Sequence, residues 1–246
     1  MAQNNNIHAG HRKRLRERYL QQGLDGFSDH EVLELLTTFA IPRGNTNPQG
    51  HALMQAFGTL AHVLEADVAD LEQVEGIGPQ SALLIHLIPA LARRYMLDKQ
   101  GKRPALSTGQ KAGEYASALL LGAKTEQLYM MCLDAKCRLR HAVKVAEGTL
   151  DEVTVYTRSV VELAIKHGAK NVILAHNHPT GSIRPSRQDL DLTQTLLHAL
   201  AAVKIQLLDH LIVGDAGVFS FVRSGALSQG TGKDVAYAAE DAIDEP

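Results

Sequence analysis

The chain contains no tryptophan, only two cysteines, and no apolar run that approaches the length of a membrane-spanning helix. Cys132 and Cys137 lack the Cys-x-x-Cys spacing and cannot supply a disulfide framework, so we expect incidental buried thiols in a reducing cytoplasm. The formal net charge of −2 gives no global electrostatic attraction to nucleic acid or to a membrane surface. The polar residues 1–6 do not have the pattern of a signal peptide. These absences argue against a disulfide-rich secreted protein and predict a cytoplasmic one without a membrane partner.

The chain does contain enough apolar residues for a buried core, because 45% of its 246 residues are hydrophobic and 21% are charged. This length fits one or two domains. In the first hundred residues, apolar side chains recur at helical spacing within 31–39, 52–57 and 81–95, which predicts an all-α region. The changes of pattern predict four parts: a helical domain over 1–97, a polar linker over 98–106, an α/β domain over 107–225 and a disordered tail over 226–246.

The α/β domain has its own expected order of elements. Ser107 or Thr108 can cap a helix that continues through Leu121. After that helix, the patterns predict strands at 127–133 and 140–146 joined by a turn at 134–136, a helix over 157–167, a strand ending at the first histidine of the motif described next, a helix over 186–203, and strands at 205–213 and 218–222.

The most informative segment is His176-Asn177-His178, which follows the apolar residues 171–175. Side chains alternate along a strand, so both imidazoles of an extended His-x-His segment point to the same side, with Cβ atoms about 7 Å apart. The preceding run is partly β-branched and predicts a buried strand that ends at this pair. Two imidazoles placed in this way can converge on one metal ion.

A carboxylate follows within reach of the two histidines. Pro179, Gly181 and Pro185 predict a turn, after which a helix opening at Ser186 brings Asp189 back toward the strand end. Two imidazoles, one carboxylate and an open position make a catalytic zinc site. Ser186-x-x-Asp189 is also an ordinary capping arrangement, with serine at the N-cap and an acid in the first turn, and the two roles are compatible.

The string His-x-His, seven residues, then Ser-x-x-Asp matches the JAMM (JAB/MPN) metalloprotein motif at every defined position, and the chain resembles that family. Segments 176–181, 185–189 and 209–214 resemble its RadC branch, as do residues 10–16 and 28–36. The chain departs from many JAMM proteases at Asn177, where those proteases often carry Ser or Thr.

The resemblance implies a fold and a ligand set. It covers residues 8 to 225 and implies an N-terminal all-α helix-hairpin-helix domain, followed by a JAMM-type α/β domain with a mixed sheet. Zn²⁺ would be the cofactor, held by His176, His178 and Asp189.

The resemblance also implies a general base and an oxyanion donor. The family places a glutamate directly before the first strand of the domain, and Glu126 matches that position. Glu126 would take a proton from the activated water, and Ser186 would donate a hydrogen bond to the developing oxyanion of a peptide or protein substrate. Glu147 and Glu152 stay open as alternative bases, whereas Glu162 lies in mid-helix and is less well placed.

Two polar residues of a later predicted strand are candidates for supporting the ligands. Asp209 and His210 could orient a ligand imidazole from behind. Alternatively, His210 only anchors its strand, and we favour this structural role slightly.

The segment from Val74 to Ala82 resembles a helix-hairpin-helix. Gly76 and Gly78 allow a tight turn, and amides at the start of the second helix can receive a DNA phosphate without reading the bases. The alternative is a plain αα-hairpin, since Gln80 and Ser81 stand where DNA-binding members usually carry basic residues.

A basic stripe precedes this segment, formed by Arg12, Lys13, Arg14 and Arg16. Such a stripe is commonly a solvated helix face, and the first hundred residues hold nine Lys/Arg against eleven Asp/Glu. The leading hypothesis is therefore a zinc-dependent hydrolase, most naturally a peptidase or isopeptidase. The alternative is a DNA-binding repair or recombination factor with a structural or non-peptidase metal site.

Overall fold

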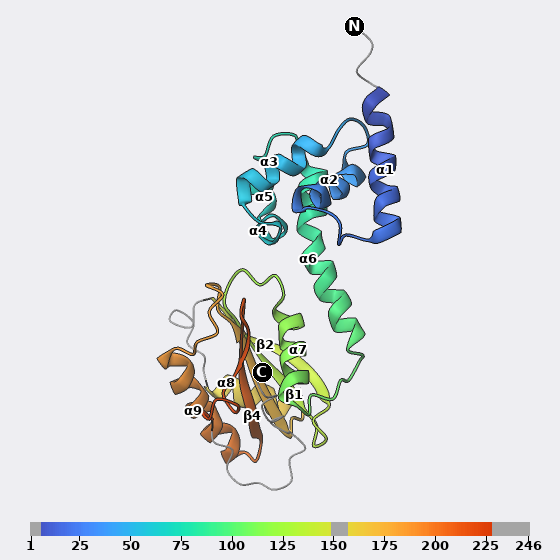
Figure 1. The fold of residues 1–246 in the computed structure, drawn as a ribbon. Coiled ribbons are helices and arrows are strands. Elements are labelled where there is room, and N and C mark those ends of the chain that lie inside the picture. Colours follow the sequence, from blue (N-terminus) through green and yellow to red (C-terminus); the bar gives the residue numbers. More distant parts are fainter. Residues whose placement is uncertain (1–5, 149–156, 228–246) are drawn as a thin grey trace, which may run out of the picture. The chain divides into compact units, whose positions relative to one another are not determined.

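The computed structural model describes residues 6–148 and 157–227, and the chain divides into two compact units, 1–92 and 93–246 (Figure 1). The boundary falls inside helix α6 (Pro79–Lys99), whereas the predicted linker over 98–106 begins at the end of that helix. Within that predicted linker, Ala105 forms a bridge with Arg138 and belongs to the second unit. The predicted tail lies outside the described residues from position 228 onward.

The first unit is all-helical. Its core consists of seven buried apolar residues, among them Leu33, Leu53 and Ile85, which follow the predicted helical spacing. Its helices are α1 (Asn6–Gln22), α2 (Asp29–Ala40), α3 (Asn47–Phe57), α4 (Leu60–Glu65), α5 (Val68–Leu71) and the first part of α6.

A buried carboxylate ties three of these helices together. Glu34 on α2 is 1% exposed, yet it contacts His11 on α1 at 2.7 Å and accepts a hydrogen bond from Asn47 on α3 at 3.0 Å. A buried carboxylate needs such partners, because desolvating it unpaired is costly. Glu34 therefore fixes how α1 and α3 pack on α2.

The predicted glycine turn lies between α5 and α6. Gly76 has φ of +80°, a conformation that glycine adopts without strain, and Ile77 beside it is 4% exposed within the core. The glycines thus serve a packed helix–turn–helix. DNA binding by this turn stays a prediction.

The second unit is built on a mixed five-stranded sheet, as expected from the sequence. Its strand order is β2-β1-β3-β4-β5, in which only the β3–β4 pair is parallel. The strands are β1 (Gln127–Leu133), β2 (Leu139–Glu147), β3 (Asn171–Asn177), β4 (Gln206–Gly214) and β5 (Gly217–Ser220), and the helices of this unit are α7 (Gly109–Leu120), α8 (Thr157–Lys166) and α9 (Arg187–Ala202). These ranges agree with the predicted ones to within a few residues.

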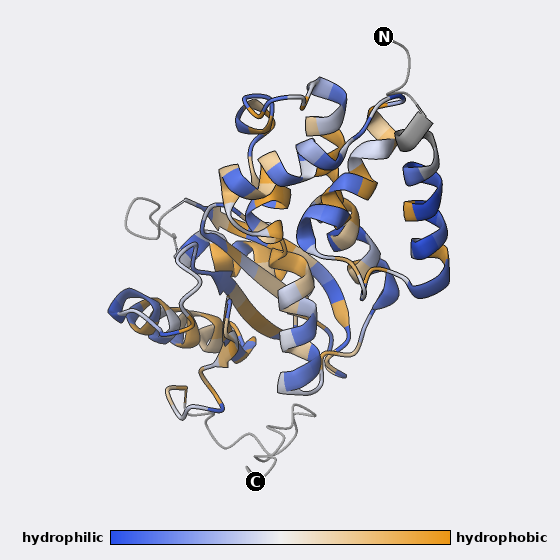
Figure 2. Ribbon diagram, turned by 45° about the horizontal axis from the view of Figure 1, so that its top comes forward, coloured by the Kyte–Doolittle hydropathy of each residue, from blue (hydrophilic) through white to orange (hydrophobic). Residues whose placement is uncertain are grey.

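Helices cover both faces of this sheet. Helix α7 packs on the face that carries Met131 and Ile173, and α8 and α9 pack on the face that carries Met130 and Leu174. The middle of the central strands β1 and β3 is apolar in Figure 2, because side chains on both of their faces are buried. Both cysteines are buried and unbridged, and burial raises the pKa of Cys132 to about 11.

Strand pairing sets the position of the candidate site. In the antiparallel β1–β3 pair, Leu128 lies opposite His176, so the segment just before β1 lies beside the end of β3. The β3–α9–β4 connection returns the start of α9 to the same end. Among the described residues, no helix is long and apolar enough to cross a membrane.

Candidate metal centre

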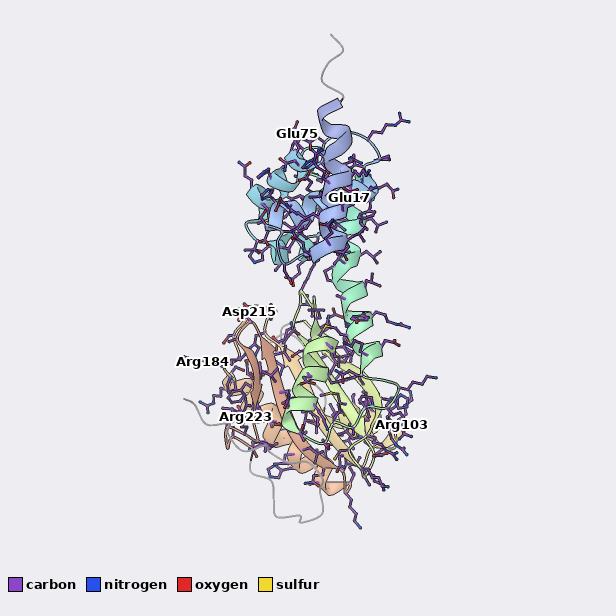
Figure 3. The ribbon with its side chains drawn as sticks, turned by 45° about the vertical axis from the view of Figure 1, so that its right-hand side comes forward. Glu17, Glu75, Arg103, Arg184, Asp215 and Arg223 are labelled. Atoms are coloured by element: carbon purple, nitrogen blue, oxygen red, sulfur yellow. The ribbon has the colours of Figure 1, made fainter. Side chains whose placement is uncertain are left out.

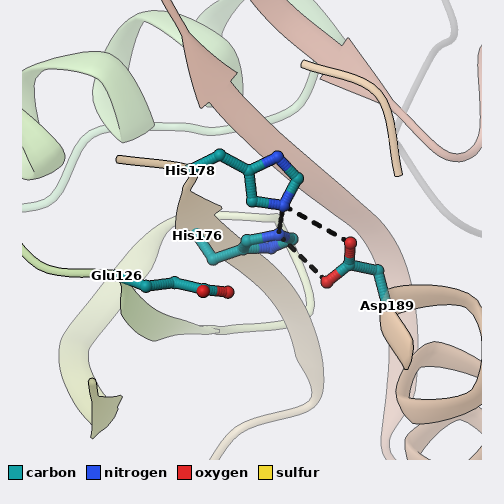
Figure 4. A group of neighbouring side chains, drawn as sticks. All are labelled: Glu126, His176, His178 and Asp189. Carbon is teal, nitrogen blue, oxygen red and sulfur yellow. Dashed lines mark hydrogen bonds and ion pairs between the residues drawn. The ribbon is translucent and has the colours of Figure 1, made fainter. Parts of the chain in front are cut away.

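Four side chains from three segments converge at the end of β3. Glu126 precedes β1, His176 is the last residue but one of β3, His178 directly follows β3, and Asp189 lies in the first turn of α9. One ligand atom from each residue lies within 4.8 Å of those from the other three. Glu126 and Asp189 lie on either side of the two imidazoles (Figure 4). All three residues predicted as metal ligands, and the predicted base, are thus brought together.

The Pro-Thr-Gly turn holds His178. Gly181 has φ of +73°, donates its N–H to the carbonyl of His178 at 2.9 Å, and accepts from the amide of Asp215 at 2.9 Å. A Cβ on Gly181 would collide with the Asp215 carboxylate, so this approach needs glycine. Because the turn brings the carbonyl of Ser182 beside the ring, His178 Nδ1 donates a hydrogen bond to that carbonyl at 2.9 Å.

The two carboxylate oxygens of Asp189 have different environments. Oδ2 accepts hydrogen bonds from the amide and the hydroxyl of Ser186, both at 2.7 Å, which completes a capping box. Oδ1 is buried without a hydrogen bond, and His176 Nε2 lies 3.1 Å from it. A buried carboxylate oxygen without a donor is stabilised by a cation, so this oxygen fits the role of a metal ligand.

A hydrogen-bond chain behind His176 determines which of its ring nitrogens carries the proton. The Thr193 hydroxyl donates to the carbonyl of Asp189, and Thr193 Oγ1 also lies 2.6 Å from His210 Nδ1. The hydroxyl has only one proton, so His210 Nδ1 must donate and His210 Nε2 must accept. His176 Nδ1, 2.8 Å away, then donates to His210, which leaves His176 Nε2 as a lone pair.

Burial, followed by the neighbouring His176 ring, lowers the pKa of His210 well below its ordinary value, so this fully buried imidazole is neutral. Burial alone would raise the pKa of Asp189, but His176 and the Ser186 hydrogen bonds outweigh it and hold that pKa well below its ordinary value. Asp189 is therefore an anion at neutral pH.

The inward-facing atoms lie at distances close to those that a tetrahedral ion requires. The two Nε2 atoms lie 3.0 Å apart, Oδ1 of Asp189 lies 3.1 Å from Nε2 of His176, and Oδ2 of Asp189 lies 3.4 Å from Nε2 of His178. Tetrahedral metal bonds of about 2.0–2.1 Å place neighbouring ligand atoms about 3.3 Å apart. Two nitrogen lone pairs and a carboxylate repel one another at such distances, so the residues present fit a bound cation.

Asn177, between the histidines, holds the segment that carries Glu126. Its Oδ1 accepts from the amide of Gln127 at 2.9 Å, and its Nδ2 donates to the carbonyl of Thr125 at 3.0 Å. These bonds bracket Glu126 on both sides, and the Glu126 carbonyl accepts from Gly148 at 2.9 Å. Asn177 itself is 7% exposed, so its side chain is held in place by the strands around it while it anchors this half-buried segment.

The other candidate acids lie elsewhere. Glu147 is exposed and pairs with Lys144 at 2.6 Å, and Glu162 pairs with Arg158 at 2.7 Å. Glu152 lies outside the described residues. Among the described residues, Glu126 is thus the predicted base that belongs to the cluster of metal-ligating side chains, and Glu147 and Glu162 are not part of it.

The two predicted supporting residues behave differently. His210 contacts the ligand His176, as described above. Asp209 accepts from the hydroxyl of Ser220 at 2.6 Å and from the amides of His210 and Val222, so it fixes the chain after β5.

The predicted phosphate contacts on α1 are largely engaged within the first unit. Arg12 donates to the carbonyls of Ile41 and Gly44, Lys13 lies 3.7 Å from Glu17, and Arg16 lies over the ring of Phe39. Arg14 is exposed.

Two residues of the centre were missed in the sequence. Thr193 stands four residues after Asp189, on the same face of a helix, and this spacing was a usable signal. The role of Asn177 depends on strand pairing across 50 residues, which no local pattern reveals.

Comparison with known proteins agrees with the site. The RadC-like JAB domain model matches residues 106–226, a range that contains all four clustered residues. A UPF0758 protein of Paraburkholderia phytofirmans is 37% identical over 210 residues, covering 85% of this chain and 81% of that protein. A UPF0758 protein of Rhodobacter capsulatus is 37% identical over 213 residues, covering 87% of this chain and 100% of that protein. This chain belongs to the RadC family.

Metal binding by this RadC-family chain should depend on the unpaired oxygen of Asp189. Asp189→Asn removes the anion while keeping the shape, so the affinity for a divalent transition metal should fall at least tenfold. Asp191→Asn changes an exposed acid on the same helix and should have no effect. The measurement is metal content after dialysis against a graded metal buffer. Equal metal content in wild type and Asp189→Asn would contradict the ligand set.

The anchoring by Asn177 predicts a stability change in this RadC domain. Asn177→Ala removes two half-buried hydrogen bonds, one from the amide of Gln127 and one to the carbonyl of Thr125. A hydrogen bond contributes about 0.5–1.5 kcal/mol to stability, so the free energy of unfolding should fall by roughly 1–3 kcal/mol. Asn177→Asp keeps the acceptor and should lose less. Urea unfolding followed by circular dichroism tests this, and an unchanged midpoint for Asn177→Ala would contradict it.

Proposed function

We propose that this protein is a zinc-dependent hydrolase that cleaves a peptide or isopeptide bond with an activated water. One observation supports this above all: two imidazole lone pairs and a carboxylate converge at tetrahedral spacing, with a second carboxylate in the same cluster. This arrangement leaves room for a water and a proton acceptor, whereas structural zinc sites are usually closed by four protein ligands.

His176, His178 and Asp189 are the residues that would hold zinc. Bound zinc supplies the charge that lowers the pKa of a coordinated water toward about 7 and polarises a carbonyl. The remaining chemistry belongs to the side chains. His210 and Ser182 keep the protons of the two imidazoles on the Nδ1 side, and Ser186 fixes Oδ2 of Asp189.

Glu126 is the proposed general base. Among the described residues its carboxylate has no hydrogen-bond or ion-pair partner, in contrast to the Asp189 carboxylate, which Ser186 holds in place. The two acids are therefore suited to different roles, one as ligand and one as proton carrier. Glu126 would take the proton from the attacking water and pass it to the leaving amine.

Ser186 has a constrained part in this proposal. Its hydroxyl donates to Oδ2 of Asp189, so it already orients a ligand. To act as the oxyanion donor that the family resemblance implies, the hydroxyl must rotate from Asp189 toward the substrate. Its oxygen can meanwhile continue to accept from the amide of Asp189, at 3.1 Å.

A second candidate function is sequence-independent DNA binding by the first unit. The observation that favours it is the tight turn at Gly76 ahead of the 21-residue helix α6, whose first amides have no partner within the helix. Gln80 is exposed in that first turn and could lie beside a phosphate.

The substitution Glu126→Gln distinguishes a working hydrolase from a protein whose metal only stabilises the fold. Glu126→Gln retains shape and ligands, so zinc content and thermal stability should barely change. Loss of a general base lowers the rate by about 10²–10⁴-fold. The measurement is hydrolysis of a peptide and isopeptide library at matched zinc occupancy, with Glu162→Gln as the exposed control. Equal rates for wild type and Glu126→Gln would remove Glu126 as the base, and inactivity of both would remove the proposed function.

A charge placed at the start of α6 tests the DNA hypothesis. Gln80→Glu stabilises a helix N-terminus through the helix dipole but repels a phosphate there. Affinity for a short duplex, measured by fluorescence anisotropy, should therefore fall several-fold while stability is kept. The control is Gln194→Glu, which makes the same change at an exposed position of α9. Binding that is insensitive to Gln80→Glu, or that does not weaken with salt, would contradict phosphate binding at this turn.

A further inference from the structure

The second unit carries another cavity, at the end of the sheet opposite the metal centre. Its volume is about 300 Å³, and its lining side chains are Arg103, Arg140, His141 and His167. The cavity residue His167 lies four residues before the start of strand β3 at Asn171, and the other end of β3 reaches the metal centre. A strand rises about 3.3 Å per residue, so the cavity and the metal centre lie roughly 20 Å apart. Figure 3 shows Arg103 and Asp215, which abuts the metal-site turn, on opposite sides of this unit.

A β-bulge explains how two consecutive residues line one cavity. Cys132 pairs with His141 and Leu133 pairs with Leu139, which leaves Arg140 as the extra residue of β2. Neighbouring residues of a regular strand point to opposite faces, whereas a bulge re-aims a side chain. Here Arg140 reaches the carbonyl of Gly168 at 3.2 Å, next to His167.

The surrounding segments are strongly basic, although the whole chain holds 25 Lys/Arg against 27 Asp/Glu. Positions 102–103, 134–141 and 166–170 hold seven Lys/Arg and a single acid, Asp134. Asp134 is already neutralised by Arg103 at 3.2 Å and Arg138 at 3.0 Å. The seven basic residues are Lys102, Arg103, Lys136, Arg138, Arg140, Lys166 and Lys170.

Two imidazoles complete the lining of this cavity. The rings of His141 and His167 lie 4.4 Å apart between centroids. Burial, then the neighbouring His141 ring and Lys166 amine, lower the pKa of His167. A neutral imidazole still has one N–H that can donate a hydrogen bond. Two guanidinium groups beside the rings repel a metal cation, so the cavity is suited to an anion.

We propose that this cavity binds a phosphate monoester dianion, either inorganic phosphate or the terminal phosphate of a small molecule. A dianion with three free oxygens can accept hydrogen bonds from guanidinium and imidazole donors together, and arginine matches phosphate bidentately. A nucleic-acid backbone phosphate carries one charge and two free oxygens, so it offers less to a cavity lined by two guanidinium groups and two imidazoles. This site is independent of the proposed hydrolase activity.

The test is calorimetric titration of the full-length protein with inorganic phosphate in a phosphate-free buffer, with and without a metal chelator. Wild type should bind one phosphate per chain in both conditions. Arg140→Gln and, as a second variant, His141→Gln should each weaken binding about tenfold or more, because the first removes a guanidinium charge and the second an imidazole donor from the lining of the cavity. Arg158→Gln, an exposed arginine of α8, is the control and should bind as wild type does.

Three results would overturn the proposal. Phosphate binding that the chelator abolishes would place the anion at the metal centre. Unchanged binding by folded Arg140→Gln and His141→Gln would place it elsewhere on the surface. A duplex without terminal phosphates that outcompetes inorganic phosphate would assign the cavity to a nucleic-acid backbone.

Discussion

The direction of the protons along one buried hydrogen-bond chain determines what the metal centre can hold. The chain runs from the carbonyl of Asp189 through Thr193 and His210 to His176. A carbonyl only accepts, and this one constraint orders every donor after it, so that His176 directs a lone pair inward. Because the carbonyl belongs to the residue whose carboxylate also faces the centre, the chain links the placement of both ligands.

The packing of the α/β unit excludes water from this hydrogen-bond chain. His210 lies in β4, the strand parallel to β3, so that His176 and His210 meet between neighbouring strands and α9 brings Thr193 over them. The ring of Phe221 stacks on His210, with centroids 4.8 Å apart. In a dry environment, a reversed hydrogen bond would leave two donors or two acceptors facing each other, which is far more costly than in water. The core therefore enforces the proton order as well as the fold.

The sequence predicted most of this arrangement, because its strongest patterns are local. Alternation placed both histidines on one side of a strand, and the serine–acid pair marked the start of α9. The Asn177 anchor and the Arg140 bulge could not be predicted, because both depend on the register between strands far apart in the chain. The basic stripe of α1 illustrates the converse. Its charges were visible in the sequence, but the hydrogen bonds that engage Arg12 appear only once α1 packs beside the α2–α3 loop.

The most direct test of this account is nitrogen-15 NMR of the histidine side chains in the metal-free, full-length protein at neutral pH. Comparison with His176→Asn and His210→Asn variants would assign the two rings. We predict that His210 is neutral with its proton on Nδ1, and that His176 carries a proton on Nδ1, which it donates to Nε2 of His210. A proton on Nε2 of His210, or an imidazolium at His210, would contradict the proton order on which the metal centre depends.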